Sequence, residues 1–267
     1  MNFIKTYSEK NAVKIIAFAI NFNQNLTNEQ IKTIIDMAKK DEFFTSNFLK
    51  VTNQTEVSFV ITPEGAPQQN ITENGVIFQS EDSNDSAWTI IVNKEHIVVT
   101  CKAYSRWNAI SKQTYSYLQK VIDIFPIEYN VSVSQITLEY LDEFEITSPN
   151  EDWKQELFRQ DNNKFLNKNV YEQNDFWHIN HGYFITLDKL ENKQLDTINI
   201  SYFSDDNDDF KNKVTIKSQH RIIIEPVQDL NKMDFISKTF NIVHNHSKEV
   251  FENIISDNIL EKFDRGE

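Results

Sequence analysis

The sequence predicts an α+β protein in which antiparallel sheets carry long helices packed on one face, arranged as two similar lobes. Strand-like segments occur in groups, and a long helical segment closes each group. This order occurs twice along the 267 residues, so we place an N-terminal α+β lobe at 1–148 and a C-terminal α+β lobe, closed by a long terminal helix, at 149–267. Hydrophobic residues make up 39% of the chain, enough for a sizeable core.

A buried strand and a capped helix open the first half. Residues 13–20 are apolar on both faces, which is typical of a central strand. Thr27, with Gln30 three residues later, forms a capping-box pattern before a helix. Two prolines and two glycines indicate a loop over 63–75.

The remaining elements follow from hydrophobic periodicity. Strands are predicted over 75–80, 86–92, 96–104, 131–146, 176–187, 195–203 and 213–227. Helices are predicted over 105–125, where Ser105 can cap the first turn, over 152–158, and over 235–255, where Asp234 is the candidate cap.

Composition excludes several classes of protein. The net charge of −13 and the lack of a basic stripe predict no direct nucleic-acid binding. The four glycines form no G-x-G, so phosphate-binding loops are excluded. The single cysteine, Cys101, allows no internal disulfide and fits a reducing cytosol. The apolar run at 15–20 is too short to cross a membrane, so we expect a cytoplasmic protein.

Residues 244–246 read His-Asn-His, which raises the question of an HNH nuclease. In those enzymes the three residues are spread over a ββα-metal unit. Here they fall on one predicted helix, where His244 and His246 point about 200° apart. We therefore reject the nuclease, place His244 at the border of the core, and expect His246 to face water.

Other histidines could still meet inside the protein. His181, His220 and His244 could all point into one interior between sheet and helix, together with Trp177, and line a ligand pocket or hold zinc. The simpler interpretation, which we favour, is that each is a separately hydrogen-bonded histidine at the edge of the core. We accordingly predict no catalytic residue, no metal site and no cofactor.

Carboxylates gather along the strand at 131–146, at Glu139, Asp142, Glu143 and Glu145. Such density is compatible with glycosidase or metal-nuclease chemistry. No E-x-K motif lies within a predicted buried strand, and we therefore assign these groups no catalytic role.

Three segments carry a resemblance to a known family: 99–122, 133–146 and 243–263. The chain resembles a sporadically distributed family of uncharacterised bacterial proteins of similar length. The positions that match the family are Tyr104, Trp107, His244, Phe251 and Glu252, whereas Gln135 and Asp142 stand where the family has arginine and asparagine. The patchy distribution implies horizontal transfer, as among phage-defence and mobile-element genes.

Together these observations favour a non-catalytic protein that binds another protein, which could be co-encoded, as an accessory part of a bacterial antiviral defence or toxin–antitoxin-like module. The alternative is a small-ligand-binding or metal-dependent hydrolytic domain with a pocket between the sheet and the C-terminal helix, lined by Trp177, His181, His220 and His244. A third hypothesis is a nucleic-acid mimic that uses its acidic surface to occupy a basic groove.

Overall fold

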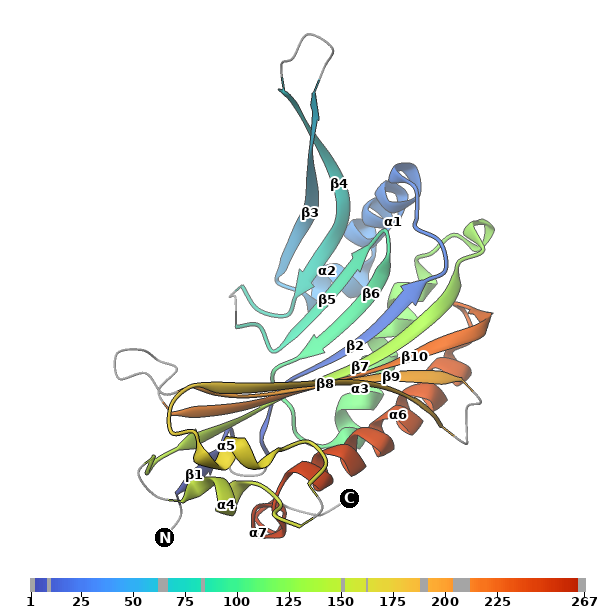
Figure 1. The fold of residues 1–267 in the computed structure, drawn as a ribbon. Helices are drawn as coiled ribbons and strands as arrows, with labels where there is room; N and C mark the ends of the chain where they lie inside the picture. Colours follow the sequence, from blue (N-terminus) through green and yellow to red (C-terminus); the bar gives the residue numbers. More distant parts are fainter. Residues whose placement is uncertain are drawn as a thin grey trace.

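One antiparallel sheet of ten strands organises the structure, a computed structural model that describes residues 3–8, 11–61, 67–82, 85–149, 152–161, 163–187, 192–203 and 212–263. The strand order is β3-β4-β5-β6-β2-β7-β10-β9-β8, and β1 pairs with the end of β7. Figure 1 shows the sheet bending from the β3–β4 hairpin at one edge to β8 at the other.

The strands are mostly long. They are β1 Ile4–Thr6, β2 Val13–Phe22, β3 Lys50–Ile61, β4 Pro67–Gln79, β5 Trp88–Asn93, β6 His96–Cys101, β7 Ser132–Ile146, β8 Trp177–Thr186, β9 Lys193–Phe203 and β10 Lys213–Asp229. The helices are α1 Asn28–Lys40, α2 Glu42–Asn47, α3 Trp107–Asp123, the 3-10 turn η1 Ile127–Tyr129, α4 Trp153–Leu157, α5 Lys168–Glu172, α6 Met233–Ile254 and α7 Asp257–Leu260.

The predicted fold class, with antiparallel sheets, long helices packed on one face and two similar lobes, is wrong. The described residues form one large sheet, and among the described helices α1, α3 and α6 alone exceed six residues, with 13, 17 and 22. Strand β7 pairs with β2 along one edge and with β10 along the other, which joins the two halves of the chain. Hydrophobic periodicity shows which face of a strand is buried, but it does not show which strands pair.

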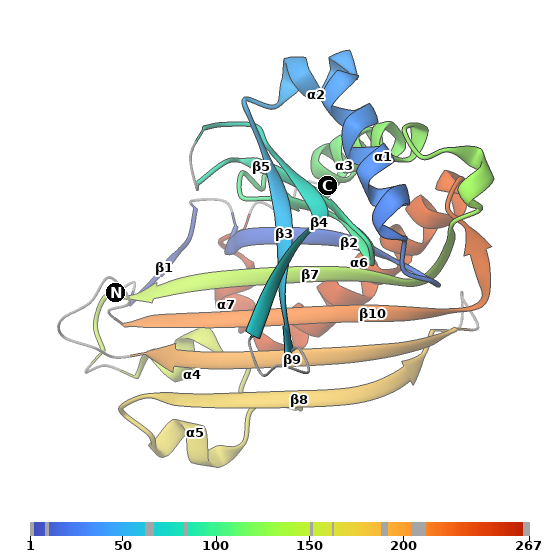
Figure 2. The same cartoon turned by 90° about the horizontal axis from the view of Figure 1, so that it is seen from above.

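Alternation along the central strands builds the core. Phe18 and Ile20 of β2 are fully buried and pack with α1, α3 and the first half of α6. A second group of buried side chains joins Phe144 of β7 to β9, β10, α4 and the second half of α6. Figure 2 shows α6 running beneath the strands β7, β10 and β9. Helix α6 therefore closes both parts of the core.

None of the described helices combines the length and the apolar character needed to cross a membrane.

Local signals were predicted with mixed success. The capping box is confirmed, because Thr27 accepts from the Gln30 backbone and the Gln30 side chain accepts from the Thr27 backbone. The loop predicted over 63–75 is wrong from Pro67 onward, where β4 begins, and its residues 63–66 lie outside the described part. The predicted caps Ser105 and Asp234 are wrong. Helices α3 and α6 begin after Arg106 and Lys232, and neither of these two residues makes a capping hydrogen bond with its side chain.

Candidate functional site

A cleft of about 870 Å³ opens between the central sheet and α6. Its floor includes Val13 of β2, Asp142 of β7 and Ser218 of β10, and one wall is the middle of α6. The lining also includes the segment from Tyr104 to Asn108, which runs into the first turn of α3. Clefts of several hundred Å³ with mixed lining are the usual size for small-molecule sites.

Asp142 is the unusual residue of this cleft. Its side chain lies on the apolar face of β7, between Tyr140 and Phe144, and the residue is 4% exposed. Among the described residues the Asp142 carboxyl has no hydrogen-bond or ion-pair partner. Burial raises its pKa to about 7. A buried carboxyl without a partner is costly, because its charge is neither solvated nor compensated.

Aromatic side chains line the same cleft as the Asp142 carboxyl. The Tyr140 hydroxyl lies 2.8 Å from Nδ1 of His244, and the His244 ring stacks on Trp107 with 3.9 Å between centroids and 6° between planes. Phe18 stacks on Trp107 from the other side, at 5.6 Å. Burial, with a smaller contribution from Lys248, lowers the pKa of His244 to about 4. The wall beside the carboxyl is therefore aromatic and uncharged near neutral pH.

Two tyrosines keep their protons beside Asp142. Burial raises the pKa of Tyr140 well above its ordinary value, and burial together with the charge of Asp142 raises that of Tyr104 to about 12. Charges of both signs occupy the outer lining, where Arg106, Lys248 and Asp257 are exposed. Arg159 at this rim is paired with Asp257, at 2.5 Å between Nη2 and Oδ1.

A separate polar cluster lies between β9, β10 and α6. The Asp196 carboxylate accepts from Nδ1 of His220 at 2.7 Å and from Nε2 of His246 at 2.6 Å. Gln194 also donates to it, at 2.5 Å. Burial alone would raise the pKa of Asp196, but the hydrogen bonds and charges of the two histidines outweigh it and hold that pKa well below its usual range. We call Asp196, His220 and His246 together the Asp196 cluster.

Each of the four residues predicted to share a pocket has surroundings of its own. His244 lines the cleft, and His220 belongs to the Asp196 cluster. Nε2 of His181 lies 2.7 Å from the backbone oxygen of Phe165. Trp177 belongs to the second group of buried side chains, where it packs against Tyr202 and Phe158. The structure thus does not bring Trp177, His181, His220 and His244 around one cavity.

Sequence reasoning assigned no role in a site to three residues of these sites. Asp142 and Asp196 each occupy an inward position of a strand whose neighbours on that face are mostly apolar, and that break in the alternation was the available signal. His246 was expected to face water, yet its side chain is 17% exposed and bound to Asp196. Its place beside Val243 and Val250 of the buried helix stripe was the corresponding signal.

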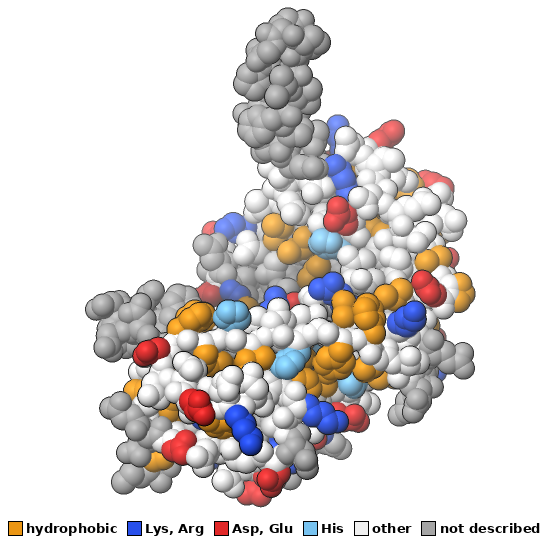
Figure 3. Space-filling view, in the orientation of Figure 1, with side chains coloured by type: hydrophobic (Ala, Val, Ile, Leu, Met, Phe, Trp, Pro, Cys, Tyr) orange, Lys and Arg blue, Asp and Glu red, His pale blue; other side chains and the backbone are white. Residues whose placement is uncertain are grey.

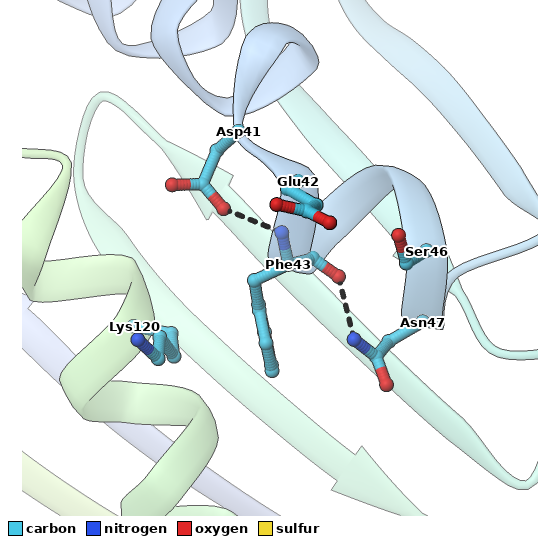
Figure 4. Close-up of a pocket in the computed structure, with 6 residues that line it drawn as sticks. All are labelled: Asp41, Glu42, Phe43, Ser46, Asn47 and Lys120. Carbon is cyan, nitrogen blue, oxygen red and sulfur yellow. Dashed lines mark hydrogen bonds between the residues drawn. The ribbon is translucent and has the colours of Figure 1, made fainter.

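A second, shallower hollow of about 450 Å³ lies between α2 and α3 (Figure 4). Two of its polar side chains already bind the backbone: Asp41 accepts from the Phe43 backbone and Asn47 donates to the Phe43 carbonyl, both at 2.8 Å. Large side chains are also exposed elsewhere, including Phe176 and Phe184. In the view of Figure 3 hydrophobic atoms form separate patches among polar ones. Neither feature offers a partly enclosed charge comparable to Asp142.

A scan against protein-family models matches none of them, and a comparison with curated protein sequences finds no match.

Proposed function

We propose that this protein binds a small molecule in the cleft between the sheet and α6, and that the ligand combines an aromatic or other flat apolar part with a cationic amine. The observation that carries the proposal is the buried Asp142 carboxyl, which lines the cleft and has no partner among the described residues. The proposal belongs to the predicted alternative of a small-ligand-binding domain with a pocket beside the C-terminal helix.

A cation is the ligand group that removes the cost of this carboxyl. An ionised acid buried without a partner loses its hydration, and an ammonium group placed beside it restores an opposite charge and donates hydrogen bonds. The neighbouring groups do not supply that charge. Tyr104 and Tyr140 are phenols with raised pKa values, and His244 is neutral above a pKa of about 4.

An apolar portion of the ligand is favoured by the walls. Tyr104, Trp107, Phe251, Leu260 and Phe263 line the cleft and remain partly exposed. Burying flat apolar surface against such side chains contributes about 25 cal/mol per Å². The cleft volume of about 870 Å³ accommodates a ligand of drug-like size.

Protein binding within a bacterial defence module stays a prediction of the sequence. The cleft is the reason that we place small-molecule binding first, because it offers a specific unsatisfied group whereas the exposed surface does not.

The proposal can be tested with three indoles that differ only in the side-chain end group. Tryptamine is cationic, tryptophol is neutral and indole-3-acetate is anionic. We expect tryptamine to bind most tightly by isothermal titration calorimetry at pH 8, with about a tenfold or greater advantage over tryptophol, since a hydrogen-bonded charge pair contributes about 1.5–3 kcal/mol.

The matched variants are Asp142→Asn and Glu139→Gln. Glu139 lies on the same strand but on the opposite face, where it pairs with Lys217. Asp142→Asn should abolish the preference for tryptamine over tryptophol, and Glu139→Gln should retain it. A preference for indole-3-acetate, or no binding of any of the three at millimolar concentration, would overturn the proposal.

A further inference from the structure

The Asp196 cluster gathers three metal-ligating side chains from three separate elements. Asp196 comes from β9, His220 from β10 and His246 from α6, and one ligand atom from each lies within 4.8 Å of the others. The side chains of Asp196 and His220 are fully buried, and that of His246 is 17% exposed. It is distinct from the cleft, whose lining contains none of the three.

The charge of this cluster is not balanced by a permanent cation. The ion-pair partners found for Asp196 among the described residues are His220 and His246, with no lysine or arginine. Since a carboxylate oxygen only accepts, both imidazole nitrogens facing it carry a hydrogen. A divalent ion held by the same three side chains would supply the opposite charge that a buried carboxylate needs.

The donor set suits a first-row transition metal. One carboxylate oxygen and two imidazole nitrogens form a three-ligand set of the kind found in open zinc sites, where water takes the fourth position. The partial exposure of His246 leaves one side on which water can enter. Gln194 donates to Asp196 at 2.5 Å and so holds the carboxylate from the outer sphere.

We propose that Asp196, His220 and His246 bind one divalent transition-metal ion, for which Zn²⁺ is the probe. Zinc–ligand bonds of about 2.0–2.1 Å require donor atoms roughly 3.3 Å apart, so each histidine nitrogen must move about 0.6 Å away from the Asp196 oxygen that it now contacts at 2.7 or 2.6 Å. Each imidazole would bind the ion as a neutral ligand through the nitrogen that now faces Asp196, with its one ring hydrogen moved to the other ring nitrogen, and any second hydrogen of an imidazolium would be released to solvent.

The test uses protein purified without a polyhistidine tag, treated with chelator, and dialysed against Zn²⁺. Bound metal is measured by inductively coupled plasma mass spectrometry and affinity by competition with a zinc indicator. The variants are His246→Gln, whose amide can still donate to Asp196 but is a poor zinc ligand, and His178→Gln, which removes an exposed imidazole on β8.

We expect about one zinc per chain in the wild type and in His178→Gln, and at least tenfold weaker binding in His246→Gln with an unchanged circular dichroism spectrum. Wild-type protein that retains no stoichiometric zinc, or equal affinity in His246→Gln, would show that the cluster is only a hydrogen-bonded structural network. If His246→Gln does not fold, Co²⁺ added to the wild type decides the matter. The visible absorption of low-coordinate, nitrogen-ligated Co²⁺ supports the site, and its absence overturns it.

Discussion

Replacing Asp142 by Asn should stabilise the protein, and by more as the pH rises. Burial raises the pKa of the Asp142 carboxyl from 3.8 to about 7, so the folded protein binds this proton more tightly than the unfolded chain does. The cost of ionising it is therefore absent below pH 4, grows with pH, and is complete above about pH 7. At about 1.4 kcal/mol per pKa unit, the upper bound on this cost is about 1.5 kcal/mol at pH 5 and about 4 kcal/mol at pH 8. The amide carries no such cost.

Urea unfolding of both proteins at pH 5 and pH 8 measures the effect as a difference in unfolding free energy. In the folded protein the pKa values of Tyr104, Tyr140 and His244, which share the cleft, lie outside this pH range, so these groups contribute little to the difference between wild type and variant. Glu139→Gln is the control, and it should cost at most about 1 kcal/mol because its ion pair with Lys217 is partly exposed. If Asp142→Asn is no more stable than the wild type at pH 8, or if its advantage does not grow between the two pH values, the carboxyl is compensated and our reasoning is wrong.

Three further predictions concern ligand affinity and local packing. Tryptamine affinity should rise by roughly tenfold or less between pH 6 and pH 8, because the amine stays protonated while Asp142, with its pKa of about 7, ionises; a flat calorimetric profile would contradict this. Gly75→Ala should lower the unfolding free energy by about 1–3 kcal/mol, because the added methyl group would lie 2.4 Å from the Val92 carbonyl oxygen. In the control Gly182→Ala the added methyl group meets nothing within 4 Å, so the unfolding free energy should change by less than about 0.5 kcal/mol. Thr27→Ala removes the confirmed capping box and should cost about 1 kcal/mol in thermal or urea unfolding, and an unchanged midpoint would show that the cap contributes nothing.

Strand and helix segments with strong periodicity could be predicted from the sequence, and the connections between them could not. Strand β2 and helix α1 could be predicted because their buried apolar residues follow a regular spacing along the sequence. Strand β3 and the first part of β4 could not be predicted in this way, because β3 begins with several polar residues, β4 contains Pro67 and Gly75, and the two strands pair with each other over most of their length. The union of both halves into one sheet likewise depends on contacts between distant segments.

The candidate sites show the same limit. A histidine is easily noticed in a sequence, so His220 and His244 were considered early, but neither residue reveals its partner. Asp196 meets His220 because their strands pair at that position, and it meets His246 because α6 packs against the same face of the sheet. Asp142 was noticed among four acids, and alternation along β7 separates it from Glu139 and Glu143, which point to the other face and bind lysines. The sequence does not show that the face of Asp142 lines a cleft beside α6. Register between distant strands is a tertiary property.

The central position of β7 has a consequence for synthesis of the chain on the ribosome. One edge of β7 finds β2, which has already been made, but the other edge waits for β10, which is completed roughly 80 residues later. At about 5–20 residues per second, that edge stays open for several seconds in every nascent chain. During this interval its unpaired backbone is available to other strands, and early engagement by a chaperone would protect it.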